Sequence, residues 1–304
     1  KPTQIAAFAI ARRVTKETPE VIAAAAEALR RHMVPLVHHE EKLLDTCGTG
    51  GDGHGSLNLS TGAALLAAAA GARVAKHGNR AVSSKSGSAD VLESLGVKLD
   101  LTPEQEAAVL HQAGIVFLFA QKHHPALRHV APARKELGVR TIFNCLGPLA
   151  SPARATHQLL GAYDDALRPV LAKTLGALGV ERAWVVRGEN GMDEMNPFGL
   201  TRVTIWENGA TREAVFKPED FALVPCAPGA TDGGDAAENA KILEDVLEGV
   251  HHPSRNAFLL NAAAALNVYD GGSPRDATAR VTEALTTGAA RRLLDKWRRT
   301  SQAV

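Results

Sequence analysis

The sequence predicts an α/β fold in which helices precede a mostly parallel sheet. Strand and helix signals alternate from Leu43 onward, which is typical of chains built from βαβ units. Between residues 45 and 96, three polar loops punctuated by glycine separate apolar segments. Loops of this kind at the ends of parallel strands are where α/β sheets bind anionic ligands.

Helix signals open the chain, and strand and helix signals fill its second half. Thr3 is expected to cap a first helix, and Thr18 a second one with Pro19 in its first turn. The later elements are strands over 183–187 and 201–206, a turn at 207–209, and helices over 235–250, 254–265 and 276–297.

The first polar loop has the sequence GTGGDG at residues 48–53. Glycines lack a Cβ, so the backbone amides of such a loop can crowd around an anion. A flexible turn between strand and helix is the alternative interpretation. No Gly-Lys-Ser/Thr closes the loop, and the glycine spacing does not fit a dinucleotide-binding fingerprint. Because Asp52 would repel a bare phosphate, we expect a cation or a sugar hydroxyl to share the site.

Three polar side chains, Asn58, Ser60 and Thr61, lie at the head of an apolar segment at 62–70 that is typical of a buried helix. One of them is expected to be the N-cap, accepting from a free amide of the first turn. The helix N-terminus is also a candidate phosphate site, through its amides and its dipole. Capping needs only one polar side chain, so the presence of three favours binding.

A short strand over 73–76 is expected to lead into a basic loop that contains Lys76, His77, Asn79 and Arg80. A solvated surface loop is the alternative interpretation. The loop follows a helix that itself follows the glycine-rich loop. Both loops should therefore lie at one edge of the sheet.

Asp90 and Glu93 fit a capping box at the start of the next helix. The serines before it, Ser84, Ser86 and Ser88, are either turn and cap residues or members of the binding site. The sequence pattern leaves both interpretations open.

Asp193 and Glu194 form an acidic pair between Gly191 and Asn196. Neighbouring residues of a strand point to opposite faces, so the pair can share one ion only from a loop, which the flanking residues predict. An ordinary acidic turn is the alternative. The histidines show no clear zinc spacing, and His77 and His124 are the candidates for the lining of a cleft.

Composition excludes several classes of function. The chain has 304 residues, a net charge of +1 and three cysteines, Cys47, Cys145 and Cys226. The balanced charge does not indicate binding to nucleic acid or to an anionic membrane, and no apolar stretch has the length of a membrane span. Few and scattered cysteines, with no signal peptide, predict a cytoplasmic protein. We expect Cys47 to be a small apolar filler rather than a nucleophile.

These motifs resemble those of the anthranilate phosphoribosyltransferases, transferases of tryptophan biosynthesis. The resemblance covers nearly the whole chain, and the joint presence of GTGGD at 48–52 and KHGNR at 76–80 is highly specific. It is carried by GTGGD at 48–52, NLST at 58–61, KHGNR at 76–80, SSKSGSAD at 83–90, His124-Pro125, Arg134, FNCLGPL at 143–149, Asp193-Glu194 and LLNAAAAL at 259–266.

The resemblance implies two domains with the active site in the cleft between them. A small helical domain would consist of residues 1–41 and 124–152. A larger α/β domain that binds phosphoribosyl pyrophosphate would consist of residues 42–123 and 153–304. Relatives usually have another helix or so before this point, so we expect the N-terminus to be truncated or processed.

The implied reaction transfers the phosphoribosyl group of phosphoribosyl pyrophosphate to the amino group of anthranilate and releases pyrophosphate. Negative charge grows on the leaving pyrophosphate, and Mg²⁺ is suited to stabilising it. The resemblance implies two Mg²⁺ ions per active site, with Ser60, Asp193 and Glu194 as ligands. We assign no general base, because the aromatic amine is neutral at pH 7 and positioning of both substrates can supply much of the rate.

The same resemblance implies which residues contact the substrates. Anthranilate would be bound by Gly48, Asn79 and Arg134, of which Arg134 matches the position that binds the carboxylate with a planar guanidinium fork. The residues implied for phosphoribosyl pyrophosphate are Gly48, Gly51, Asp52, Ser56, Asn58, Ser60, Thr61, Lys76, His77, Asn79, Ser84 and Ser88.

A homodimer formed through the N-terminal helices is also implied, and whether a glutamine amidotransferase is a partner is left open. Two alternatives are kept. A pyrimidine nucleoside phosphorylase of the same fold should contain a different lysine–serine phosphate motif, which we do not find. A non-catalytic relative that binds a ligand or nucleic acid should have lost the glycine-rich loop or the acidic pair, and both are present.

Overall fold

The computed structural model describes residues 1–15, 17–50, 53–81 and 85–304. Within these residues the centre of the fold is a seven-stranded sheet with the order β3-β2-β1-β4-β5-β6-β7. The first five strands of this order are parallel, and the last two are antiparallel. The strands are β1 (Leu44–Gly48), β2 (Val74–Gly78), β3 (Ile115–Phe119), β4 (His157–Gly161), β5 (Arg182–Gly188), β6 (Thr201–Glu207) and β7 (Ala210–Phe216).

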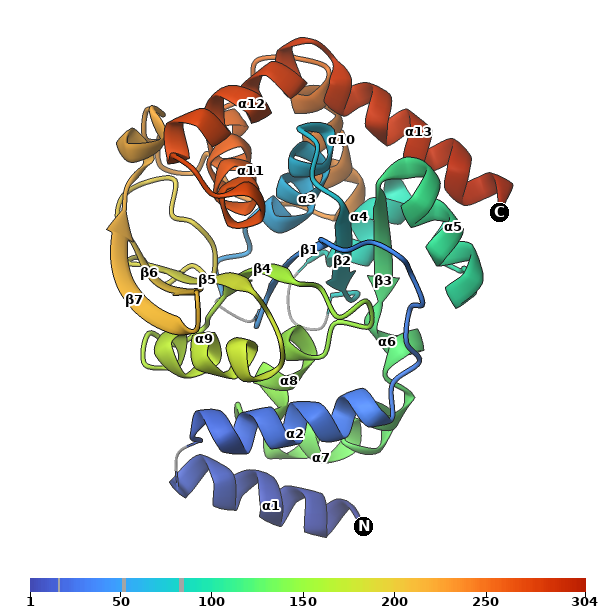
Figure 1. The fold of residues 1–304 in the computed structure, drawn as a ribbon, viewed down its shortest axis with the longest axis vertical. Coiled ribbons are helices and arrows are strands. Elements are labelled where there is room, and N and C mark those ends of the chain that lie inside the picture. Colours follow the sequence, from blue (N-terminus) through green and yellow to red (C-terminus); the bar gives the residue numbers. More distant parts are fainter. Residues whose placement is uncertain (16, 51–52, 82–84) are drawn as a thin grey trace.

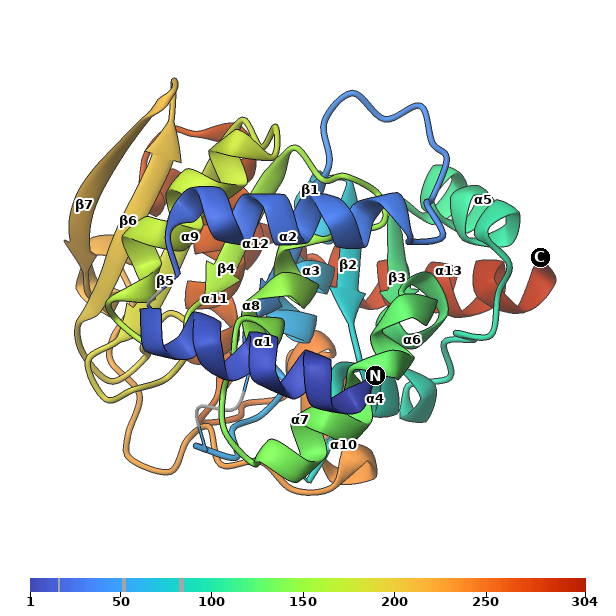
Figure 2. The same cartoon turned by 90° about the horizontal axis from the view of Figure 1, so that it is seen from below.

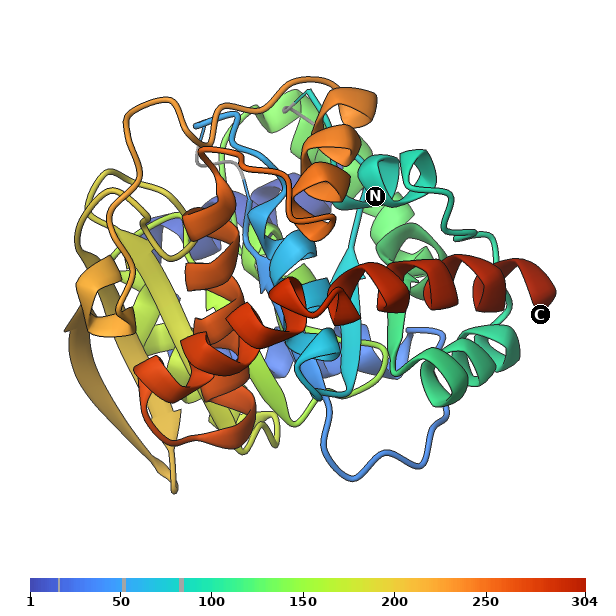
Figure 3. The ribbon, with the colours of Figure 1, turned by 90° about the horizontal axis from the view of Figure 1, so that it is seen from above.

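Helices cover both faces of the sheet (Figures 1 and 3). The helices on the first face are α3 (Leu59–Ala69), α4 (Ser88–Ser94), α5 (Pro103–Ala113), α10 (Ala236–Leu247), α11 (Arg255–Asp270), α12 (Pro274–Thr286) and α13 (Ala289–Ala303). Those on the second face are α1 (Pro2–Thr15), α2 (Pro19–Arg31), α7 (Ala131–Leu137), α8 (Phe143–Leu149) and α9 (Leu167–Ala177). Short connections are α6 (Ala120–His123) and the 3-10 helices η1 (Pro125–His129) and η2 (Pro218–Phe221).

Each face of the sheet has its own hydrophobic core. The larger core joins the strands to α3, α11 and α13, and it includes Leu65, Phe258 and Trp297. The smaller core joins them to α2, α8 and α9, and it includes Ile22, Leu146 and Leu171. Burial on both faces explains the continuous apolar runs of β3 (IVFLF) and β5 (AWVV at 183–186), whereas β1, β2 and β4 also contain buried polar residues such as Asp45, Lys76 and Gln158.

The N-terminal helices lie together with α7 and α8 on the second face (Figure 2). Helix α2 packs against α8 and α9, and α1 packs against α7. As predicted, α2 is capped by Thr18, whose hydroxyl accepts from the amide of Val21 at 3.4 Å. None of the described helices is long and apolar enough to cross a membrane.

Three of the sequence predictions about helix ends are wrong. Helix α1 begins at Pro2, so Thr3 lies inside it and is not its cap. The expected capping box between Asp90 and Glu93 is wrong, because α4 begins earlier and Asp90 accepts from the amide of its N-cap residue, Gly87, at 2.9 Å. The single helix expected over 276–297 is broken at Gly288, where φ is 72°, a conformation that favours glycine.

Candidate active site

A cavity of about 260 Å³ lies where β1, β2, β4 and β5 end. Parallel α/β sheets bind ligands at that edge, outside the carboxyl ends of the strands. The structure brings together here most of the site residues that the sequence predicted. Those that line the cavity are Gly48, Ser56, Asn58, Ser60, Lys76, His77, Asn79, Ser88, Asp193 and Glu194.

The remaining predicted residues are placed differently. Gly51, Asp52 and Ser84 lie outside the described residues. Thr61 is buried in α3 rather than in the cavity lining, and its hydroxyl oxygen has no hydrogen-bond partner among the described residues. Arg134 is half-buried on α7 and is not part of the lining either.

The acidic pair lies in a loop after β5, as predicted, and that loop is held against the ends of two other strands. Asp193 accepts from the amide of Gly50 at 2.7 Å through its Oδ2. A Cβ added to Gly48 would lie 2.5 Å from this oxygen, and one added to Gly161 would lie 1.5 Å from the carbonyl oxygen of Asp193. Only glycine at these two strand ends allows the acidic loop to approach so closely.

Helix α3 is capped in a way that the sequence did not predict. Asn58 occupies the N-cap position, but its side chain makes no capping bond. Instead the Oε1 atom of Glu194 accepts from the amide of Ser60 at 3.2 Å. The expectation that one of Asn58, Ser60 and Thr61 is the N-cap residue is confirmed, because Asn58 holds that position. The expected side-chain capping bond is wrong, because a carboxylate from a distant loop accepts from the helix amide instead.

Lys76 places a positive group under the N-terminus of α3. It lies within β2 rather than in the basic loop, and its Nζ donates to the carbonyl of Thr46 at 2.6 Å and to the hydroxyl of Ser60 at 3.2 Å. Burial lowers the pKa of this amine. The neighbouring Asp45 is also buried, which raises the pKa of its carboxyl to about 7, although it accepts from the amide of His77 at 3.0 Å.

Other side chains around the cavity are held neutral. Burial lowers the pKa of His77 well below its ordinary value and that of His124 to about 4. Their rings meet edge to face with centroids 5.0 Å apart, but only His77 belongs to the cavity lining. Burial also raises the pKa of the Cys47 thiol well above its usual range. A neutral thiol is a poor nucleophile, as expected for a filler.

The oxygen donors in this cavity fit magnesium better than a softer metal. Ser60, Asp193 and Glu194 provide one hydroxyl and two carboxylates at the same cavity. In the part of the chain that the structure describes, no group of three His, Cys, Asp or Glu side chains can hold a metal ion. Mg²⁺ does not need such a cage, because it binds through one or two carboxylates together with substrate phosphates and water.

Three residues of the site were missed by sequence reasoning. Gly161 is needed for the close approach of the acidic loop, and nothing in the local sequence signals this. Asn261 is buried in α11 and pairs with both the amide and the carbonyl of Met195, next to the acidic pair. One asparagine in the middle of the apolar run AFLLNAAAAL at 257–266 was the available signal. Asn239, on α10, donates to two residues of the cavity lining, Asn58 and Ser86, and nothing in its local sequence indicated this.

Comparison with known proteins shows which family has this architecture. Residues 40–291 match the model of the glycosyl transferase family a/b domain, and residues 1–33 match that of its helical bundle domain. The chain is 48% identical to an anthranilate phosphoribosyltransferase of Thiobacillus denitrificans over 292 residues, which are 95% of this chain and 85% of the relative.

Solved structures agree. A crystal structure of anthranilate phosphoribosyltransferase from Thermus thermophilus matches with a TM-score of 0.93 and 41% identity, covering 99% of this chain and 91% of that one. The enzyme from Saccharomyces cerevisiae in complex with phosphoribosyl pyrophosphate and Mg matches with a TM-score of 0.90 and 31% identity, covering 100% and 86%. With this fold, this cavity and these relatives, the chain belongs to the anthranilate phosphoribosyltransferase family.

Proposed function

We propose that the cavity binds phosphoribosyl pyrophosphate with Mg²⁺ and transfers its phosphoribosyl group to the amino group of anthranilate, releasing pyrophosphate. One observation carries this proposal. The glycine-rich loop, the N-terminus of α3 and the acidic pair surround a single cavity at the carboxyl ends of parallel strands.

The phosphate groups would be bound by donors that the fold already positions. The amides of Gly50 and Ser60 donate to the carboxylates of Asp193 and Glu194, which supports an edge of the sheet that attracts negatively charged oxygens. Lys76 adds a cationic group at the head of the same helix. Donors fixed before the reaction stabilise charge that develops on the leaving pyrophosphate without having to reorganise.

Ser60, Asp193 and Glu194 are the residues that would hold magnesium. When bound, the metal would neutralise charge on the pyrophosphate as the bond to ribose breaks. Asp193 and Glu194 are held by backbone bonds from the glycine-rich loop and from the first turn of α3, so the metal and the phosphates would be bound by the same framework. Whether one or two ions bind is a separate question that a metal titration answers.

Arg134 is our candidate for the carboxylate of anthranilate. Burial lowers the pKa of its guanidinium, and no described residue forms a hydrogen bond or ion pair with that group. A half-buried, unpaired guanidinium is suited to a carboxylate, which it can bind through two parallel bonds. Gly48 and Asn79, which we also assign to anthranilate, lie in the cavity lining.

We further propose the division into a helical domain, residues 1–41 with 124–152, and an α/β domain made of the rest. The exposed apolar side chains of Phe8 and Val14 on α1 support a homodimer formed through the N-terminal helices. Size-exclusion chromatography with light scattering tests this. A cytoplasmic location remains a prediction from the few, scattered cysteines, and the question of a glutamine amidotransferase partner stays open. Neither a nucleoside phosphorylase nor a non-catalytic relative is favoured by the comparisons.

The decisive experiment follows the fluorescence of anthranilate with phosphoribosyl pyrophosphate, with and without Mg²⁺. The proposal predicts loss of fluorescence that requires the metal. If fluorescence is unchanged but calorimetry detects binding of the sugar phosphate, the acceptor is wrong. If calorimetry detects no binding either, the assignment of the cavity is wrong.

A further inference from the structure

The segment before α10 pairs with a stretch of the cavity lining, a contact that no motif indicated. The amide of Leu57 donates to the carbonyl of Thr231 at 2.8 Å, and the amide of Gly233 donates to that of Gly55 at 2.9 Å. Ser56 and Asp232 form an isolated antiparallel bridge between these bonds. Residues 55–57, which follow the glycine-rich loop, are therefore paired with residues 231–233, which lead into α10.

Asn239, in the first turns of α10, links the segment before this helix to two polar loops of the cavity, those that contain Asn58 and Ser86. Its side chain is buried, with an exposure of 3%. Its Oδ1 accepts from the amide of Gly234 at 2.8 Å. Its Nδ2 donates to Oδ1 of Asn58 at 3.0 Å and to the hydroxyl of Ser86 at 2.8 Å. Asn58 and Ser86 both line the cavity.

These bonds fix the orientation of the side-chain amide of Asn239 first, and through it that of Asn58. A backbone amide can only donate, so Gly234 requires the oxygen of Asn239 on its side. The Nδ2 of Asn239 must then face Asn58, which presents its own oxygen and also accepts there from the hydroxyl of Ser86 at 3.2 Å. The donor end of Asn58 is left on the opposite side, where one N–H approaches the carbonyl of Ser86 at 3.5 Å.

We propose that Asn239 is a positioning residue that orients Asn58 so that a donor, and not a carbonyl oxygen, is available to the anionic oxygens of the sugar phosphate. The phosphate oxygens of such a ligand can only accept hydrogen bonds, so the reversed amide would repel them. Asn239 also ties the loop that contains Asn58 to the loop that contains Ser86. The identity of the ligand rests on the proposed function.

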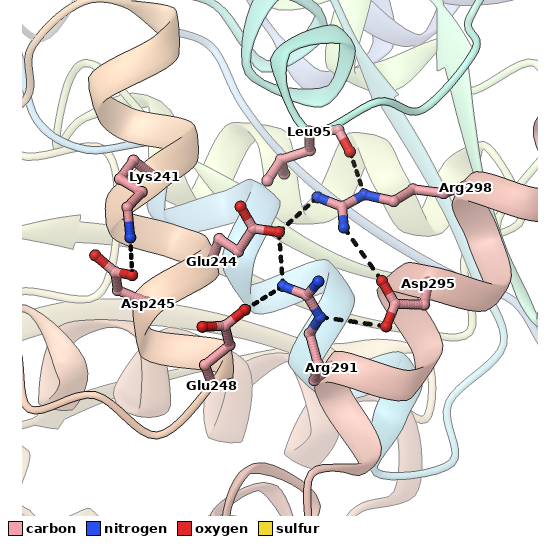
Figure 4. Close-up of polar contacts among 8 residues, drawn as sticks. All are labelled: Leu95, Lys241, Glu244, Asp245, Glu248, Arg291, Asp295 and Arg298. Atoms are coloured by element: carbon pink, nitrogen blue, oxygen red, sulfur yellow. Dashed lines mark hydrogen bonds and ion pairs between the residues drawn. The ribbon is translucent and has the colours of Figure 1, made fainter.

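The far end of α10 is anchored, which keeps Asn239 in place (Figure 4). Glu244 accepts from Arg291 at 2.6 Å and from Arg298 at 2.8 Å, and Glu248 also accepts from Arg291. Arg298 in turn donates to the carbonyl of Leu95, which follows α4. Networks of this kind restrain a helix more than isolated surface pairs do.

The test compares Asn239→Ala with Asn239→Asp by calorimetric binding of phosphoribosyl pyrophosphate with Mg²⁺. Alanine removes both donors, and we expect affinity to fall about tenfold. Aspartate can still accept from Gly234 but cannot donate to Asn58, so it favours the reversed amide. We expect its affinity to fall about threefold further. The KM for anthranilate should stay within about twofold of the wild type in both variants.

Two controls separate this mechanism from simpler ones. Lys241→Ala, on the exposed side of the same helix where Lys241 pairs with Asp245, should bind like the wild type. In an Asn58→Ala background the difference between alanine and aspartate at position 239 should disappear. If it persists, repulsion by the added charge explains it and the positioning role is wrong.

The outcomes for the ligand and for Asn239 are distinguishable. Failure of the wild type to bind overturns the proposed function. Wild-type binding together with unchanged binding by Asn239→Ala overturns the role of Asn239 alone. If the variants at 239 do not fold, Ser86→Ala, which removes one of the two acceptors of Asn239, should weaken binding about threefold, and unchanged affinity there would contradict the proposal.

Discussion

The cavity at the strand ends and the helix that contains Arg134 are built in different ways. In the cavity, the carboxylates are fixed by bonds from separate elements, because Asp193 accepts from Gly50 of the glycine-rich loop and Glu194 accepts from Ser60 of α3. Arg134 lies on a helix of seven residues, and its guanidinium forms no hydrogen bond or ion pair with a described residue. The charged sugar phosphate is thus matched by a preorganised framework, whereas the acceptor carboxylate is assigned to one unrestrained guanidinium.

This difference teaches where each substrate should gain its affinity. A preorganised site loses little conformational entropy on binding, so its contacts act together and fail together. An unrestrained side chain contributes a separable amount of binding energy. Substitutions in the cavity should therefore affect turnover, and substitution of Arg134 should affect mainly the affinity for the acceptor.

The largest expected effect comes from removing the charges of the acidic pair. Asp193→Asn combined with Glu194→Gln should lower kcat by about 100-fold or more, because stabilisation of the leaving pyrophosphate is lost. A magnesium titration of the turnover rate measures this. Wild-type turnover across the titration would remove both residues from the metal site.

His124, which packs against His77 beside the cavity, should make the free energy of unfolding depend on pH. His124 is buried against His77, and its pKa is about 4 when folded, against 6.5 ordinarily. The unfolded chain therefore binds the proton first as the pH falls, so stability decreases below about pH 6.5. This group alone should lower the unfolding free energy by about 2 kcal/mol between pH 8 and pH 5.

Urea unfolding at both pH values compares the wild type with His124→Gln, in which this part of the dependence should vanish. His39→Gln, at an exposed histidine, should keep the wild-type dependence. His77 adds to the loss of stability in acid, while the raised pKa of Asp45 acts in the opposite direction. Equal pH dependence in the wild type and His124→Gln would show that the buried ring does not control it.

Arg134→Ala should have the smallest effect on turnover and the most selective effect on binding. We expect the KM for anthranilate to rise about tenfold, as for loss of a paired charge-assisted hydrogen bond. The KM for phosphoribosyl pyrophosphate should change less than about twofold. Arg128→Ala, at an arginine on η1, is the matched control. Similar increases for both substrates would contradict the separation of the two regions.

The sequence predicted the fold class and the polar loops that meet at the cavity, because both depend on local patterns. Alternating strand and helix signals place the polar loops at one edge of the sheet, and this alone groups Gly48, Ser60 and Lys76. The acidic pair was found through the motif and its flanking loop residues.

The errors and omissions arose where distant segments decide the outcome. The cap of α3 comes from Glu194, which is 134 residues from Ser60. Gly161 matters because the backbone of Asp193 packs on it. Asn239 sits in an amphipathic helix where a polar residue is ordinary, and its role depends on the approach of Asn58 and Ser86. No local pattern contains these contacts.

The most direct test of the separation is calorimetric binding of phosphoribosyl pyrophosphate with Mg²⁺, in the absence of anthranilate, to three proteins. These are the wild type, Arg134→Ala, and the double variant at Asp193 and Glu194. We predict that Arg134→Ala binds as tightly as the wild type while the double variant loses the metal-dependent part of its affinity. Equal weakening in both variants would show that the cavity and Arg134 act as one unit and would contradict the account.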